Sequence, residues 1–331
     1  MKKLLDDPNE AVTDSLRGLG LAHADILAVR HDPTYVVRAS GTPAGRVGVV
    51  SGGGSGHEPL HVGFVGEGML DAAAPGAVFT APSPDQVAAA VRAADGGAGV
   101  VVIVKNYTSD VLNFEVGVEI AEEAGARVAT VLVDDDVAVE DSVYTAGRRG
   151  VAGTLFAEKI AGAAAARGAG LDEVVAVTER AVSRVRTMGV ALTSCTVPQV
   201  GRPGFDLPDD EVEIGIGIHG EPGRYRVPAA GAGDICRRLV DAVLDDLALP
   251  VGAQVLLLVN GMGGTPSSEL YVAYARARDR VEERGLEVAR SLVGTFVTSL
   301  EMQGVSISVA LLDDELTALW DAPVRTAALT W

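Results

Sequence analysis

Short apolar runs of strand length recur along this chain, separated by segments in which apolar residues follow helical spacing. In the first half, apolar runs occupy 47–50, 100–104 and 128–133, and we expect a short strand at 78–80. Helices are predicted at 8–20, 84–94 and 110–124, and a short, glycine-interrupted helix at 60–70. This alternation of strand and helix predicts a largely parallel sheet with helices on its faces.

The second half repeats the alternation. Residues 154–188 indicate two helices around a glycine turn, and 198–208 is rich in proline and glycine without periodicity. Beyond it we predict strands at 212–218, 254–259, 288–297 and 305–311, and helices at 233–247, at 267–284 and from Asp313. The expected fold is therefore α/β, with two α/β domains, 1–188 and 189–331, each a largely parallel or mixed sheet flanked by helices.

Composition narrows the classes of function. Hydrophobic residues make up 48% of the 331 residues, which is ample for a core, and no apolar run reaches the ~18 residues of a membrane span. The formal net charge of -18 disfavours binding to nucleic acid or to anionic membranes. The N-terminus becomes acidic at Asp6 before any apolar segment, so we expect no signal peptide and a cytoplasmic protein. Cys195 and Cys236 lack metal-ligand spacing, and no metal site is expected.

One glycine-rich loop stands out at the end of a predicted strand. The apolar run 47–50 leads into Ser51-Gly52-Gly53-Gly54-Ser55-Gly56 and then His57-Glu58-Pro59. Loops at the ends of buried strands are where open α/β sheets place their ligands. We therefore favour a functional loop over a simple flexible turn.

Two further strands run into polar residues that are able to do chemistry. The run 100–104 is followed by Lys105 and Asp110, and the run 213–218 by His219. An exposed Lys105–Asp110 ion pair is the plainer interpretation, but the place at a strand end favours function. His23 and His31 are expected to be structural, and His61 is ambiguous. The acidic triple 134–136 indicates a solvated strand end.

Several motif matches compete with this interpretation. Residues 215–220 match G-x-G-x-x-G, but a turn follows instead of a helix, so dinucleotide binding is rejected. Residues 53–57 nearly match a nucleophile elbow, and Ser55, Asp110 and His219 fall in the hydrolase order. A Ser55-dependent hydrolase is thus the alternative from another reaction class. The loop Asn260–Pro266 is equally well explained as a sharp turn or as a ligand contact.

Six stretches of the chain, taken in chain order, resemble one family, the substrate-binding K subunit of dihydroxyacetone kinase. Together they span nearly the whole chain, and the ordered set is far more specific than any single motif. The matching stretches are Gly52–Pro59, Gly68–Ala73, Lys105–Phe114, Gly217–Gly223, Asn260–Pro266 and Glu301–Ser308.

The resemblance implies a chemistry and a set of site residues. A short-chain ketose is expected to bind covalently through its carbonyl carbon to His219, as a hemiaminal, with His57 and Asp110 as the acid/base pair near the substrate hydroxyl. The Gly54, Ser55 and Gly56 segment and Lys105 are implied as substrate contacts. The chain is expected to form a homodimer and to carry no metal.

The resemblance also places the phosphoryl donor outside this chain. A separate nucleotide-binding L subunit, carrying ADP or ATP with Mg, is expected to dock here, and a phosphotransferase-system M subunit is expected to recharge bound ADP. An L-type partner that uses free ATP is the other option. Leu60, Val62, Phe64 and Ser109 depart from the usual family pattern. The substrate is therefore dihydroxyacetone or another short ketose such as erythrulose, and a ketose-sensing regulatory paralogue remains an alternative.

Overall fold

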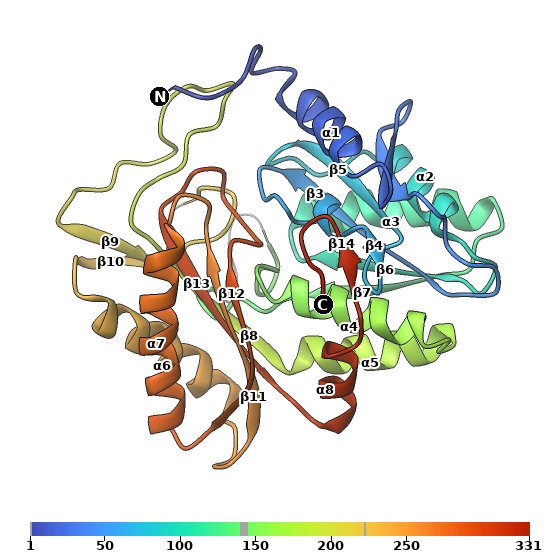
Figure 1. The fold of residues 1–331 in the computed structure, drawn as a ribbon. Helices are drawn as coiled ribbons and strands as arrows, with labels where there is room; N and C mark the ends of the chain where they lie inside the picture. Colours follow the sequence, from blue (N-terminus) through green and yellow to red (C-terminus); the bar gives the residue numbers. More distant parts are fainter. Residues whose placement is uncertain (1, 140–144, 222) are drawn as a thin grey trace.

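Two six-stranded sheets, each flanked by helices, make up the protein (Figure 1). The structure is a computed structural model and describes residues 2–139, 145–221 and 223–331. In the first sheet the strand order is β1-β2-β5-β3-β6-β7. Its strands are β1 (Leu27–Arg30), β2 (Tyr35–Arg38), β3 (Gly48–Ser55), β5 (Ala72–Val78), β6 (Val100–Lys105) and β7 (Val128–Val133). The four strands β5, β3, β6 and β7 are parallel, as expected, and β1 and β2 add an antiparallel edge.

Helices cover both faces of this sheet because its central strands are apolar on both sides. Every residue of β6 is buried. On one face lie α2 (Pro84–Ala94) and α3 (Thr108–Glu123), and on the other α4 (Thr154–Ala166) and α5 (Leu171–Ser183). Helix α2 begins with a capping box between Ser83 and Gln86, and Pro84 occupies its first turn. Helix α1 (Ala11–Ala22) packs beside β1.

The second sheet is mixed and mainly antiparallel, in the order β10-β9-β8-β13-β11-β12. Only β11 and β12 pair in parallel. Helices α6 (Ala232–Leu247) and α7 (Ser267–Glu283) cover one face, and the other packs against the first unit in a shared hydrophobic core. The strands are β8 (Val185–Ala191), β9 (Glu211–Ile214), β10 (Tyr225–Pro228), β11 (Gln254–Gly261), β12 (Glu287–Gly294) and β13 (Gly304–Leu311).

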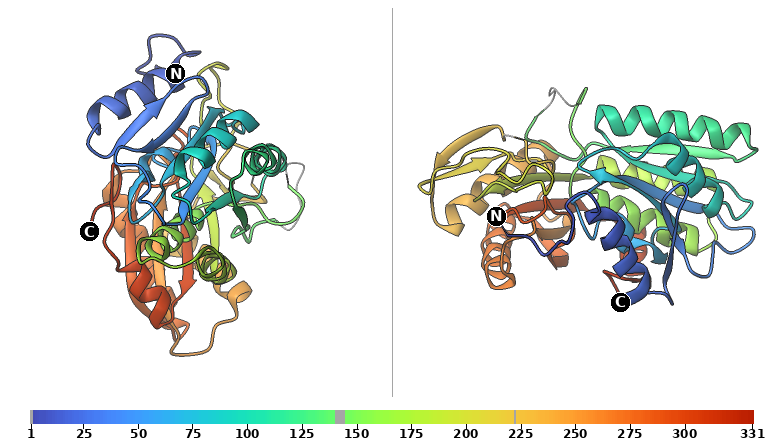
Figure 2. Two further views of the ribbon diagram at one scale, coloured as in Figure 1. Left: turned by 90° about the vertical axis from the view of Figure 1, so that its right-hand side faces the viewer. Right: turned by 90° about the horizontal axis from the view of Figure 1, so that it is seen from above.

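The last residues return to the first unit, and the two units lie side by side (Figure 2). Helix α8 (Asp314–Trp320) packs on α4, and β14 (Arg325–Thr326) pairs with β4 (Gly66–Glu67). The ring of Trp331 packs on Trp320 with centroids 5.5 Å apart. The chain therefore completes its first unit with its final segment.

Several predicted elements differ from the observed ones. The predicted helix at 60–70 contains only a short 3-10 turn, η1 (Val62–Phe64), because its glycines allow close backbone approach: a Cβ on Gly66 would clash with the Arg325 carbonyl. The strand expected at 78–80 is β5, which instead ends at Val78. The second helix predicted within 154–188 ends at Ser183, and the residues after it form strand β8 (Val185–Ala191) instead of continuing the helix. Strand β8 also crosses the predicted division at 188/189. That division stays a prediction.

Candidate active site

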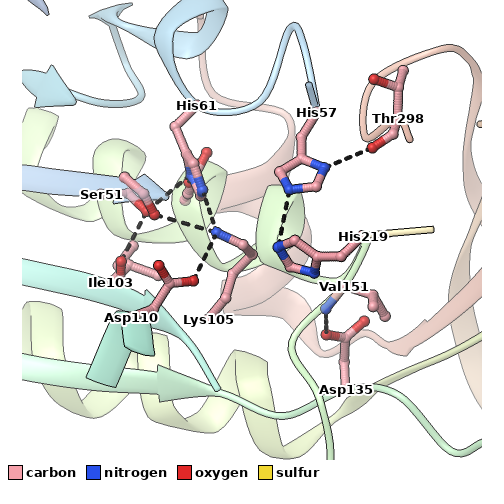
Figure 3. Close-up of polar contacts among 12 residues, drawn as sticks. Ser51, His57, His61, Ile103, Lys105, Asp110, Asp135, Val151, His219 and Thr298 are labelled. Carbon is pink, nitrogen blue, oxygen red and sulfur yellow. Dashed lines mark hydrogen bonds and ion pairs between the residues drawn. The ribbon is translucent and has the colours of Figure 1, made fainter. Parts of the chain in front are cut away.

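Three chain segments meet where the two units join. His57 follows β3, Asp110 lies in the first turn of α3 after β6, and His219 follows β9 in the second sheet. Figure 3 shows His57 and His219 pointing toward each other, with Lys105 and Asp110 beside them. Because β3 and β6 are parallel neighbours, their following loops emerge at one edge of the sheet. The predicted acid/base and anchoring residues are thus brought together from both sheets.

A cleft of about 620 Å³ opens beside this cluster. His219 and Asp110 both line it, together with Tyr107 and Phe79. His57 is fully buried and lies behind the cleft wall, against His219. His219 is therefore the imidazole that a bound molecule meets first.

The two histidines form a hydrogen-bonded pair whose protons can be assigned. His57 Nδ1 lies 2.8 Å from the Thr298 carbonyl oxygen, which only accepts, so this nitrogen carries the proton. Neutral His57 then has a lone pair on Nε2, which lies 3.2 Å from His219 Nε2. His219 must therefore donate from Nε2, and its Nδ1 holds the lone pair. Within the described part of the chain, this buried Nδ1 has no hydrogen-bond partner.

Burial keeps both imidazoles neutral. Loss of solvent is the main cause that lowers the pKa of His219 to about 3, and the charges of Lys105 and Arg149 add to it. Burial likewise lowers the pKa of His57 well below its ordinary value, with contributions from His219 and Lys105. A neutral imidazole is the form able to act as a nucleophile or to accept a proton.

Aromatic rings hold the pair in place. Phe79 stacks on His57 with ring centroids 5.2 Å apart, and Tyr107 meets the edge of His219 at 4.3 Å. Phe79 has φ of 55°, a conformation that a bulky residue rarely adopts. Gly56 allows the approach of Phe79, since a Cβ there would lie 2.8 Å from the phenyl ring. The glycine loop thus shapes the histidine site through packing.

Lys105 and Asp110 form a buried ion pair, so the alternative of an exposed pair does not apply. Lys105 Nζ lies 3.8 Å from Asp110 Oδ2, and both side chains are almost inaccessible to solvent. Burial raises the pKa of Asp110, while Lys105 opposes the rise. Among the described residues, Asp110 Oδ1 has no hydrogen-bond partner. Asp110 therefore lines the cleft, and its second carboxylate oxygen is buried there without a hydrogen bond to any described residue.

His61, whose role the sequence left ambiguous, contacts Lys105 and also Glu158, a residue that the sequence analysis did not single out. His61 Nε2 lies 2.8 Å from Lys105 Nζ, and His61 Nδ1 lies 2.5 Å from Glu158 Oε1. Both side chains are fully buried. A signal for Glu158 was present, because it lies in the otherwise apolar, alanine-rich segment 154–166, where an unpaired charge is costly.

The remaining predicted loop residues have structural partners. Ser55 Oγ donates to the Gly76 carbonyl at 2.7 Å, and no hydrogen bond from it to an imidazole occurs within the described residues. A Ser55 nucleophile would lack its base, so the hydrolase alternative finds no support here. A Cβ on Gly54 would lie 2.7 Å from the Thr80 backbone nitrogen. The expected ketose contacts of Gly54, Ser55, Gly56 and Lys105 stay predictions.

An arginine secures the loop that carries His219. Arg149 pairs with Asp136 at 2.6 Å and with Glu221 at 3.0 Å, and it donates to the Gly215 carbonyl. Glu221 in turn accepts the backbone N–H of His219 at 2.8 Å. Burial raises the pKa of Asp136 to about 6 even though Arg149 opposes the rise. Pro222, in the same motif, lies outside the described residues.

The expected solvated strand end at 134–136 is therefore wrong for two of its three residues. Asp135 and Asp136 are buried, and Asp135 accepts the backbone N–H groups of Val151 and Gly153. Asn260 is likewise structural, because its side-chain amide donates to the Val297 carbonyl and accepts from the Val297 backbone N–H. Burial with full hydrogen bonding explains these polar residues.

Comparison with known proteins places this arrangement in a family. The Dak1 domain model matches residues 17–328. The chain belongs to the Dak1 family. The dihydroxyacetone-binding subunit of the PEP-dependent dihydroxyacetone kinase of Escherichia coli (strain K12) is 45% identical over 355 residues, which cover 100% of this chain and 99% of that one.

Two solved structures share the Dak1 fold closely. The dihydroxyacetone kinase of C. freundii in its native form matches with a TM-score of 0.89 and 34% identity, over 98% of this chain and 60% of that one. This chain thus spans somewhat less than two thirds of that kinase. A dihydroxyacetone kinase operon co-activator matches with a TM-score of 0.90 and 33% identity, over 95% of this chain and 97% of that one.

The described residues contain neither a membrane-spanning helix nor a cluster of metal ligands. None of the helices there has the length and apolar character required to cross a bilayer. No group of three or more His, Cys, Asp or Glu in the same residues is arranged to hold a metal ion.

Proposed function

We propose that this chain is the ketose-binding subunit of a dihydroxyacetone-type kinase, a phosphotransferase acting on an alcohol group. The observation that carries the proposal is the neutral His219 at the cleft wall, hydrogen-bonded through Nε2 to His57 at 3.2 Å. Family membership supports it, because the E. coli relative is a dihydroxyacetone-binding subunit of similar length.

His219 captures the ketose carbonyl as a hemiaminal. A ring nitrogen of His219 forms a bond to the carbonyl carbon while the C=O π bond breaks and its electron pair moves to oxygen. The Nε2 proton of His219 passes to His57 Nε2, and His57 returns a proton to the new alkoxide, so charge and protons balance. Because burial lowers the pKa of His57, the imidazolium form is short-lived and gives its proton up readily.

Asp110 serves the phosphoryl transfer that follows. Its unpartnered Oδ1 accepts the proton of the ketose hydroxyl as that oxygen attacks phosphorus. Positioning and charge stabilisation dominate such transfers, so a buried carboxylate at a fixed distance from the covalent anchor suits the task. In this proposal His57 transfers protons at the carbonyl group of the ketose, and Asp110 accepts the proton of its hydroxyl group.

The phosphoryl donor comes from a partner that reaches the cleft. The cleft of about 620 Å³ falls within the ~300–1,000 Å³ of drug-sized ligand sites and exceeds the need of a three-carbon ketose. We infer an L-type subunit with ADP or ATP and Mg, and an M-type phosphotransferase subunit that recharges it. The name of the PEP-dependent E. coli relative favours that donor system. A homodimer in the cytoplasm completes the proposal.

A regulatory role is the second candidate, favoured by one observation. The co-activator matches this chain over nearly its whole length, so the fold serves regulation as well as catalysis. His219 and Asp110 line one cleft and His57 lies directly behind it, and this grouping favours the kinase role over the regulatory one. The same site admits erythrulose in place of dihydroxyacetone.

Native mass spectrometry tests the central step. We expect the mass of one ketose added per chain with dihydroxyacetone, surviving mild activation, and no such adduct with glycerol or in His219→Ala. His31→Ala, at an exposed histidine, is the matched control and should bind like the wild type. If no short ketose gives an adduct, covalent capture is refuted. Phosphorylation of three- to five-carbon ketoses with an L-type subunit then ranks the substrates, and absence of any product would favour the regulatory role.

A further inference from the structure

Behind the cleft, a continuous array of buried polar groups connects Asp110 to the inside of the first unit. Asp110 pairs with Lys105, Lys105 contacts His61, and His61 contacts Glu158 on α4. Figure 3 shows Lys105 between His61 and Asp110. We propose that His61 and Glu158 are positioning residues, which hold Lys105 as an ammonium group beside Asp110.

Hydrogen-bond directions around Ser51 determine the tautomer of His61. Ser51 Oγ donates its only proton to the Ile103 carbonyl at 2.8 Å. The contact of 3.0 Å between Ser51 Oγ and His61 Nδ1 therefore requires a proton on Nδ1. Glu158 Oε1, at 2.5 Å, accepts the same proton more strongly. Neutral His61 consequently presents the lone pair of Nε2 to Lys105.

This lone pair in turn favours a charged lysine. An ammonium group carries only N–H donors, and Lys105 faces two hydrogen-bond acceptors, the Gly52 carbonyl at 3.2 Å and His61 Nε2 at 2.8 Å. The carboxylate of Asp110 lies 3.8 Å away as its ion-pair partner. The opposite tautomer of His61 would point an N–H at Lys105, and the lysine would have to become a neutral amine to accept it. Glu158 therefore fixes the charge of Lys105 through the orientation of one proton.

Electrostatics act in the same direction. Burial lowers the pKa of Lys105, and the nearby charges of Asp110 and Glu158 are what oppose that loss. Burial raises the pKa of Glu158 to about 8 although the charge of Lys105 opposes the rise, so Glu158 carries its full charge on the alkaline side, where Lys105 would otherwise lose its own. Burial is also the main cause that lowers the pKa of His61, which stays neutral. The charge of Lys105 also acts on His57 and His219.

A purely structural role explains Glu158 poorly. It lies in the middle of α4, whose described residues 154–165 are all buried and mostly apolar. Replacing such a buried carboxylate with an apolar side chain of similar size is often neutral or stabilising. If Glu158 served only to fill the core, an apolar side chain would suffice. A carboxylate is needed if Glu158 sets the charge of Lys105.

The consequence for catalysis rests on the function proposed above. A charged Lys105 lowers the pKa of Asp110, so that Asp110 is ionised and able to take the hydroxyl proton. If Lys105 becomes neutral, the pKa of Asp110 rises further, and less of the ionised base is present. Because the charge of Lys105 acts here on the protonation of Asp110, we expect its loss to affect turnover much more than ketose affinity.

Histidine NMR tests the array without any substrate. The chain contains only five histidines, so [15N]histidine labelling gives a simple long-range 1H–15N spectrum in which His61→Gln identifies the His61 signals. We expect wild-type His61 as a neutral ring protonated on Nδ1. Glu158→Gln, which retains an acceptor oxygen, should retain this tautomer. Glu158→Met, which removes the acceptor, should populate the Nε2-protonated form. Wild-type His61 found as an imidazolium or with its proton on Nε2 would overturn the proposal.

The pH dependence of phosphorylation, measured with the nucleotide-bearing partner, tests the functional part. In Glu158→Gln and Glu158→Met we expect the alkaline limb of the kcat profile to move to lower pH by about one unit, with KM changed less than about twofold. Lys159→Met is the matched control, since this neighbouring buried charge donates to the Leu319 carbonyl and should leave the profile unchanged. Profiles of both Glu158 variants superimposable on the wild type would refute the role. An inactive wild type would instead count against the proposed kinase function, and the histidine spectra would still decide the array.

Discussion

Acidification should destabilise this protein through His219, and the size of the effect follows from its burial. The folded-state pKa of His219 is about 3, against an ordinary value of 6.5. Between these two pH values the unfolded chain binds a proton that the folded chain excludes. The stabilising contribution of neutral His219 is therefore complete above about pH 6.5 and is lost as the pH falls toward 3.

One excluded proton changes the free energy of unfolding by about 1.4 kcal/mol per pH unit. From about pH 6.5 to about pH 5, His219 alone should thus cost about 2 kcal/mol of stability. His57, whose pKa is also lowered by burial, adds to the same slope. His219→Gln removes the titrating ring and retains an N–H donor toward His57.

Urea unfolding followed by circular dichroism at half-unit pH steps measures the difference. The wild type should lose stability more steeply than His219→Gln, so that the two curves of free energy against pH diverge by about 2 kcal/mol over this range. His31→Gln, at an exposed position, is the control and should run parallel to the wild type. Parallel curves for wild type and His219→Gln would show that His219 is not buried in its neutral form.

Three other predictions concern residues around the pair. Asp110→Asn should lower the phosphorylation rate by about 10²–10⁴-fold, as expected for loss of a general base, while the ketose adduct still forms in mass spectrometry; an unchanged rate would exclude Asp110 as the base. Arg149→Met should cost about 3–5 kcal/mol in urea unfolding, because it leaves two carboxylates buried without their cation, and a loss below 1 kcal/mol would contradict the buried pairing. Phe79→Leu should weaken the packing on His57 by about 0.5–1.5 kcal/mol and reduce adduct occupancy at low ketose concentration, and unaltered occupancy would rule out a positioning role for the ring.

The helices and the central strands were predictable because their patterns are local. The bounds of α2 match the prediction at 84–94, and its serine and proline start signals are in the sequence. Strand β6 shows as an uninterrupted apolar run, since helices bury both its faces. In contrast, the alanines of β5 and the mixed residues of β8 become strands only through pairing with distant neighbours, which no local pattern contains.

The candidate site was accessible from sequence only in part. His57, Asp110 and His219 were found because each follows a strand and belongs to a motif. Glu158 was not, because its partner lies nearly a hundred residues away in the chain and its environment depends on how α4 packs. The same limit explains the acidic triple, where burial of Asp135 and Asp136 comes from contacts with later loops.

The return of the final segment to the first unit has a consequence for the order of folding. Ala328 donates to the Gly63 carbonyl, and β14 completes the short sheet with β4, close to the turn that carries His61. During synthesis, residues 314–331 emerge after the second sheet, so the first unit stays incompletely covered until that whole sheet has been made. The His61 region therefore reaches its final packing only after residues 314–331 have been made, and domain-by-domain maturation from the N-terminus does not apply to this part of the molecule.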